Sequence, residues 1–225
     1  MMRTGFDGID HVFGGMRCSD VIVIGGRPGM GKTSFALDAA VYSVYTEGEK
    51  VSIFTTQNEV ENVRNGLAAR GWQDTDANLS IYSHEILSVS WIEEKLDADN
   101  TDIVIIDDLQ HIGRSKKKKA AQMISIVRQI KEIAKAYHVP ILLLTDISRR
   151  IEYRNDHRPH LKDVPSYESV ISYIDSILLL YREAYYDMDA RRDKAQCYIV
   201  HNRRGELGDI PLKWHDDRNG FSNEN

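Results

Sequence analysis

The sequence contains little cysteine and no long apolar run. Its two cysteines, Cys18 and Cys197, are far apart and have no metal-ligand partners nearby, so we expect two reduced thiols rather than a disulfide or a zinc site. No apolar stretch approaches the roughly 20 residues that cross a bilayer, and the first residues lack the apolar core of a signal peptide. We therefore expect a cytoplasmic protein with no membrane partner.

A surplus of positive charge is also absent. The formal net charge of the 225 residues is −5, which argues against a protein that coats nucleic acid through its overall charge. With 42% hydrophobic and 28% charged residues, the composition is that of a packed globular domain, and the length suits one large domain. One local basic run stands out against this background. It comprises Arg114, Lys116, Lys117, Lys118 and Lys119.

Short apolar runs rich in β-branched residues recur along the chain. Continuous runs of this kind are typical of strands buried on both faces of a parallel sheet. Helical patterns lie between them, the best from 120 to 137, with Arg128, Lys131, Glu132 and Lys135 on its polar face. Strands that alternate with helices predict an α/β fold: a mostly parallel, twisted sheet with helices on both faces. The strand runs are 21–24, 51–54, 103–106, 140–144 and 177–180, and weaker helical patterns cover 33–45, 59–70 and 89–96.

The last third of the chain is more polar. Residues 146–169 show no sustained period and predict a long loop. Residues 196–201 and 209–214 alternate in polarity around a turn, which predicts a C-terminal β-hairpin. We expect one domain over 1–215, followed by a polar, frayed tail over 216–225.

A glycine-rich motif follows the first apolar run and precedes a helix. It fits the pattern G-x-x-x-x-G-K-[ST] of a phosphate-binding loop in full. Its glycines allow backbone N–H groups to approach phosphates, and the helix start adds positive charge. The lysine is expected to reach the β- and γ-phosphates of ATP. The residues predicted to bind ATP are Gly26, Arg27, Pro28, Gly29, Met30, Gly31, Lys32 and Thr33.

Two oxygen donors predict a magnesium site beside this loop. Thr33 supplies a hydroxyl, and Asp107 closes the run 103–106, so its carboxylate lies at the edge of the sheet where ligands of such folds bind. Asp107 could instead cap a helix.

Several segments are similar to one known family. The form Arg27-Pro28-x-Met30-Gly31-Lys32-Thr33, the segment 105–110 (Ile-Ile-Asp-Asp-Leu-Gln), the pair 181–182 (Tyr-Arg) and the turn 202–205 (Asn-Arg-Arg-Gly) resemble the C-terminal, RecA-like ATPase domain of DnaB-like replicative helicases. KaiC and RadA types of RecA-like ATPase fit these segments less well. The resemblance implies a P-loop NTPase that forms a hexameric ring and couples hydrolysis of ATP, with Mg²⁺, to movement along single-stranded DNA.

One departure from the family concerns hydrolysis. Where the family carries a glutamate that polarises the attacking water, this chain has Gln57, and loss of a general base costs about 10²- to 10⁴-fold in rate. Glu59 could replace it if the alignment slips by two residues. Asp108, directly after Asp107, is the other candidate for a catalytic carboxylate. Weak hydrolysis would favour an alternative function, a nucleotide-regulated interaction protein.

The resemblance also implies contacts beyond the phosphate loop. A sensor glutamine of the family is replaced by Asp146, and its K-x-R pair reads His201-Asn202-Arg203. Arg203 is therefore the candidate finger that completes a neighbouring subunit's site, with Arg204 as an alternative. The basic run 114–119 corresponds to a DNA-contacting loop of the family, so we expect DNA binding there, although lysine runs are commonly only solvated.

Overall fold

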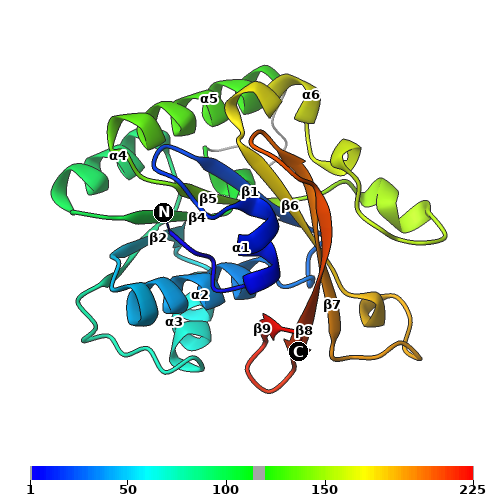
Figure 1. Ribbon diagram of the computed structural model, residues 1–225. Helices are drawn as coiled ribbons and strands as arrows, with labels where there is room; N and C mark the ends of the chain where they lie inside the picture. The colour runs from blue at the N-terminus through cyan, green and yellow to red at the C-terminus, as the bar shows by residue number, and fades with distance from the viewer. Residues whose placement is uncertain (1, 114–119, 225) are drawn as a thin grey trace.

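A single twisted sheet organises the protein. The structure, a computed structural model, describes residues 2–113 and 120–224, and they form a nine-stranded sheet of order β3-β2-β4-β5-β1-β6-β7-β8-β9 (Figure 1). The first six strands in this order run parallel, and the last three are antiparallel. The strands are β1 (Val21–Gly26), β2 (Val51–Thr56), β3 (Leu79–His84), β4 (Ile103–Asp107), β5 (Ile141–Asp146), β6 (Ser176–Tyr181), β7 (Lys194–Asn202), β8 (Gly208–His215) and β9 (Gly220–Asn223).

Helices cover both faces of the sheet, which confirms the predicted α/β class. On one face, α2 (Lys32–Tyr42) and α3 (Val60–Ala68) pack over a core that also includes α1 (Asp7–Phe13). On the other, α4 (Val89–Ala98), α5 (Ala120–Ala136) and α6 (Tyr167–Val170) enclose a second core (Figure 1). β1 and β2 are buried along their whole length because side chains of both cores pack against them.

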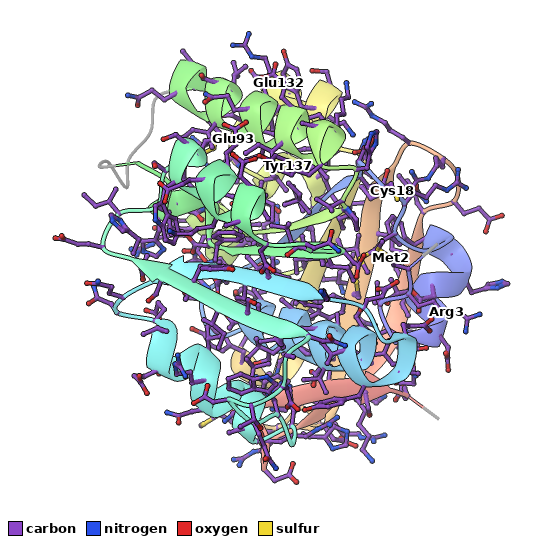
Figure 2. The ribbon with its side chains drawn as sticks, turned by 90° about the vertical axis from the view of Figure 1, so that its left-hand side faces the viewer. Met2, Arg3, Cys18, Glu93, Glu132 and Tyr137 are labelled. Atoms are coloured by element: carbon purple, nitrogen blue, oxygen red, sulfur yellow. The ribbon has the colours of Figure 1, made fainter. Side chains whose placement is uncertain are left out.

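The polar and apolar faces predicted for α5 agree with its burial except at one position. Glu132 points outward, and Tyr137, just after α5, lies over α4 and donates to the Glu93 carbonyl at 3.4 Å (Figure 2). Lys131, assigned to the polar face, is instead buried, with its Nζ 2.6 Å from a carboxylate oxygen of Asp175. The ion pair explains how a lysine is accommodated in the packed side of the helix.

The predicted long loop over 146–169 is wrong in part. It contains single helical turns at Arg149–Tyr153 and Leu161–Asp163 and the short α6. Arg154 holds the segment together through a bond of 2.6 Å to Asp163, which is itself buried. Elements of one turn carry no period that a sequence pattern can reveal.

The C-terminal hairpin is confirmed, but the frayed tail is wrong. β7 and β8 pair antiparallel, and β9, within the expected tail, pairs with β8. Phe221 on β9 is only 2% exposed and lies edge-on to Phe35 of α2. The Phe221 ring, the pairing with β8 and the bond from Phe221 N to Asp38 attach this polar segment to the core.

Cys18 is an exposed free thiol, and Cys197 is a buried one. Among the described residues, no helix combines the length and apolarity needed to cross a membrane.

Candidate nucleotide site

The glycine-rich loop turns between the end of β1 and the start of α2. Gly29 and Gly31 have φ angles of 83° and 92°, a backbone conformation that favours glycine. A Cβ on Gly31 would lie 2.7 Å from the Phe221 ring, and one on Gly29 would lie 2.7 Å from the Tyr185 ring. Both backbone shape and close packing therefore require glycine here, and the loop takes the form that exposes backbone N–H groups to phosphates.

Two side chains of the loop turn away from its mouth. Met30 is 1% exposed and belongs to the core beneath the loop. Arg27 is also buried, and its guanidinium donates to Glu152 at 2.7 Å and to the Ile147 carbonyl at 3.0 Å. These residues anchor the loop, so they can approach a nucleotide only through their backbone.

Lys32 is paired with the residue that ends β5. Its Nζ lies 2.7 Å from Oδ1 of Asp146, and the two strands place Gly26 and Asp146 in register. The lysine side chain is 10% exposed and the aspartate side chain 38% exposed. The carboxylate thus sits where the γ-phosphate is expected, and a bound phosphate would compete with it for the lysine.

Thr33 and Asp107 meet as the sequence predicts. The threonine Oγ1 donates to Asp107 Oδ2 at 2.7 Å. Burial raises the pKa of Asp107 to about 6, while the bond from Thr33 opposes the rise and the charge of Asp108 adds to it. A hydroxyl and a carboxylate are oxygen donors that fit Mg²⁺. Within the described residues, no group of three or more acidic, histidine or cysteine side chains that could hold a metal ion is found.

The raised pKa predicts a pH dependence for metal-assisted nucleotide binding. Asp107 holds a proton below about pH 6 and is ionised above it, so its help to Mg²⁺ is present above that pH and is lost as the pH falls through it. We expect the advantage of wild type over Asp107→Asn in Mg²⁺-dependent binding of a fluorescent ATP analogue to be large at about pH 7.5 and small at about pH 5. Titration of the nucleotide itself cancels in this ratio. An equal advantage at both pH values would contradict the assignment.

Asp108 and Gln57 occupy different surroundings. Asp108 caps the helical turn Leu109–His111: its Oδ1 accepts from the His111 backbone N at 3.2 Å and lies 2.9 Å from the His111 ring. Burial raises the pKa of Asp108, and His111 opposes the rise. Gln57 is exposed after β2, with its backbone N bonded to the His84 carbonyl at 3.2 Å.

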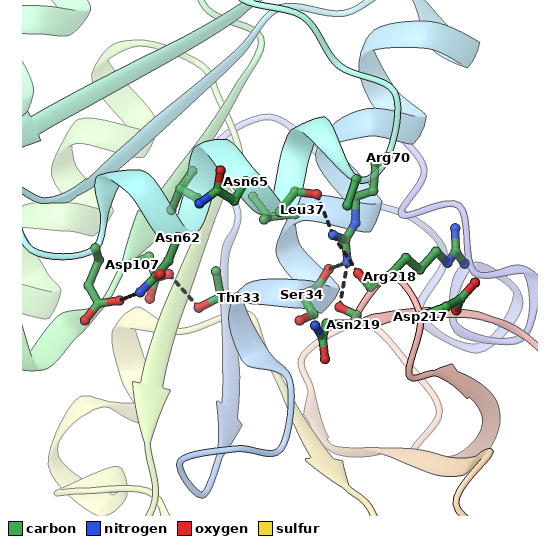
Figure 3. A pocket seen from close by; sticks show the side chains of 14 residues that line it. Thr33, Ser34, Leu37, Asn62, Asn65, Arg70, Asp107, Asp217, Arg218 and Asn219 are labelled. Carbon is green, nitrogen blue, oxygen red and sulfur yellow. Dashed lines mark hydrogen bonds between the residues drawn. The ribbon is translucent and has the colours of Figure 1, made fainter.

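A cavity of about 440 Å³ opens beside Thr33 and Asp107. Thr33, Asn62 and Asp107 lie at one end of it, and Arg70, Asp217 and Arg218 at the other (Figure 3). Glu59 is one of its lining residues, whereas Gln57 and Asp108 are not.

The mouth of the phosphate loop includes residues whose role the sequence did not suggest. A pocket of about 310 Å³ is bounded by Lys32, Arg182, Trp214 and Asn219. The Arg182 guanidinium stacks 3.6 Å from the centre of the Trp214 ring. Trp214 comes from the C-terminal hairpin, so only the sheet topology brings it to the loop.

The structure places Arg203 away from the nucleotide site of its own chain. Its Nη1 is 3.8 Å from Asp175, and its backbone N donates to the Asp175 carbonyl at 2.9 Å. Asp175 binds Val21 N at the start of β1, whereas the phosphate loop follows its end, roughly 16 Å away at 3.3 Å per residue. Arg204 is occupied by a two-bond pair with Asp20. The basic run from Arg114 to Lys119 lies outside the described residues.

The parallel sheet, the glycine loop at its edge and the Thr33–Asp107 pair define a RecA-like ATPase domain. The sequence matches the family described as DnaB-like helicase C terminal domain over residues 1–73 and 73–223, and the chain belongs to that family. It is 29% identical to the replicative DNA helicase DnaB of Geobacillus stearothermophilus over 253 aligned residues, which cover 98% of this chain and 56% of that protein. The replicative helicase DnaC of Bacillus subtilis gives the same values. The chain therefore spans about half the length of these relatives.

Solved structures agree on the fold. One of them, a structure of an isolated ATPase domain, superposes with a TM-score of 0.86 at 25% identity, covering 100% of this chain and 91% of that one. A DnaB-like replicative helicase, solved in a study of its interactions with primase, gives 0.87 at 24% identity, covering 100% and 62%. A KaiC-like protein from Pyrococcus horikoshii reaches 0.74 at 16% identity, covering 100% and 98%. The last two likenesses concern the fold alone.

Proposed function

We propose that this chain is the ATP-binding and ATP-hydrolysing motor domain of a DnaB-like replicative helicase that acts on single-stranded DNA. The observation that carries the proposal is the bond of 2.7 Å between Thr33 and Asp107 beside the glycine loop. It joins the two predicted metal ligands at the mouth of the loop, within a chain of this helicase family.

Each part of the site has a separate role in this proposal. The backbone of the loop and Lys32 bind the phosphates, and Thr33 and Asp107 hold Mg²⁺. When bound, the ion neutralises charge on the β- and γ-phosphates. Arg182, stacked on Trp214, bounds the pocket above the loop and is placed to face the nucleoside.

The site is completed by another copy of the chain in a hexameric ring. The Arg203 side chain is 39% exposed at the edge of the sheet opposite its own phosphate loop, so it can serve only a neighbour's nucleotide. A guanidinium there would stabilise the charge of phosphoryl transfer. The basic residues Arg114 and Lys116 to Lys119 are proposed to bind DNA phosphates within the ring.

Hydrolysis depends on a carboxylate or an amide that acts on the attacking water. Gln57 can orient a water but cannot take its proton. Asp108 is an ionisable neighbour of Asp107, although it already bonds the turn that follows it.

The experiment that tests this function is ATP turnover with and without a single-stranded oligonucleotide. A motor domain is expected to turn over faster with DNA, because movement and hydrolysis are coupled. A hydrolysis-weak regulatory paralogue would instead bind ATP and show the same low turnover under both conditions.

A further inference from the structure

The cavity beside the metal site contains a carboxylate that the family pattern does not assign. Glu59 lines it together with Thr33 and Asp107. A water molecule in this cavity would share it with Glu59 and with both predicted metal ligands.

Backbone hydrogen bonds hold the main chain of Glu59, and one hydrogen bond from Asn62 orients its side chain. Glu59 immediately precedes α3, where its backbone N donates to the Thr56 carbonyl and its own carbonyl accepts from Val63 N, both at 3.0 Å. Asn62 Nδ2 donates to Glu59 Oε2 at 2.9 Å. Among the described residues, Oε1 has no hydrogen bond from protein, so this oxygen remains able to accept a proton from water.

The two rival positions are less suited to this task. The Oδ1 atom of Asp108 accepts from the backbone N of His111, and Asp108 does not line the cavity. Gln57 and Glu59 are both exposed, but Gln57 lies outside the cavity and carries no carboxylate.

We infer that Glu59 is the general base of ATP hydrolysis in this chain, with Asn62 as its positioning residue; the inference rests on the proposed function. The water oxygen forms a bond to the γ-phosphorus as the bond between that phosphorus and the β–γ bridging oxygen breaks. The electron pair of the broken bond leaves with ADP. Glu59 Oε1 accepts the proton of the water and then releases it to the phosphate product or to solvent.

The test is ATP turnover and ATP affinity of Glu59→Gln in the full chain, with single-stranded DNA present. We expect turnover to fall about 10²- to 10⁴-fold, the usual effect of losing a general base, while affinity for ATP stays within a few-fold of wild type. Glu61→Gln is the matched control, because Glu61 is exposed on the same helix outside the cavity, and it is expected to keep wild-type turnover.

Asn62→Ala gives a second readout that a purely structural role would not move. Because Asn62 only orients the carboxylate, kcat is expected to fall without a matching rise in KM. Wild-type turnover in Glu59→Gln overturns the inference, as does loss of turnover in Asp108→Asn alone. If the wild-type chain does not turn over ATP with or without DNA, the proposed function is contradicted, and the inference that rests on it is contradicted as well.

Discussion

Lys32→Ala is expected to lower ATP turnover by about 10²- to 10³-fold, the effect of removing one preorganised donor to developing charge. The lysine side chain is only 10% exposed, so its charge acts in a site with little water. Its current partner, Asp146, shows that the ammonium group already lies at the edge of the sheet, where phosphates would bind. The measurement is steady-state release of phosphate at saturating ATP.

The same substitution should leave the fold intact. Asp146 is 38% exposed and can be solvated once the lysine is gone, so we expect the free energy of unfolding to change by no more than about 1 kcal/mol. Lys135→Ala, on the exposed side of α5, is the matched control and should keep wild-type turnover. Equal turnover in the two variants would contradict the assignment of Lys32.

Arg70→Ala is expected to cost about 3–5 kcal/mol of unfolding free energy, because it leaves a buried carboxylate without its partner. The Arg70 guanidinium lies 2.7 Å from Asp38, and the two side chains are 3% and 9% exposed. It also donates to the Gly66 carbonyl at 2.7 Å and to the Asn219 carbonyl at 2.9 Å, bonds that link α3 to the turn before β9 (Figure 3). Asp38 in turn accepts from Phe221 N at 2.6 Å.

Urea unfolding of Arg70→Ala and Arg64→Ala measures this effect against a surface pair. Arg64 lies 2.5 Å from Asp74, but the side chains are 39% and 69% exposed, so its loss should cost no more than about 1 kcal/mol. Similar losses of unfolding free energy in the two variants would contradict the role of Arg70 in connecting α2 and α3 to the turn before β9.

The parallel sheet could be predicted because the sequences of its central strands are themselves rich in apolar residues. β1 and β2 are buried along their whole length; β1 contains only apolar residues and glycine, and β2 carries Val51, Ile53 and Phe54. The phosphate loop is equally local, since its glycines are required by the backbone at Gly29 and Gly31. The pairing of Thr33 with Asp107 followed from topology, because both lie at the same edge of the sheet.

Other features depend on contacts between distant parts of the chain. β3 lies at the edge of the sheet and is only half-buried, so its sequence does not need to be apolar throughout. β9 is short and has Phe221 as its buried aromatic residue, so it carries no apolar run either. Lys131 is buried because the Asp175 carboxylate and the Ser19 carbonyl, both distant in sequence, accept hydrogen bonds from its ammonium group. A local pattern contains no information about such partners.

The candidate site shows the same division. The motif located Lys32, yet nothing in it indicated the pair with Asp146 or the stacking of Arg182 on Trp214. Alignment to the family favoured Gln57, whereas the cavity contains Glu59, two residues later. Motif comparison does not detect a shift of two residues after a strand, yet this shift decides whether an amide or a carboxylate is the candidate residue.

The most direct test of this account is steady-state ATP turnover by the wild-type chain in the presence and absence of single-stranded DNA, with Lys32→Ala as the blank and duplex DNA as the control. The account predicts turnover well above the blank and a severalfold rise with single strands that duplex does not reproduce. Turnover at the level of the blank under every condition, in a protein that still binds ATP, would contradict it.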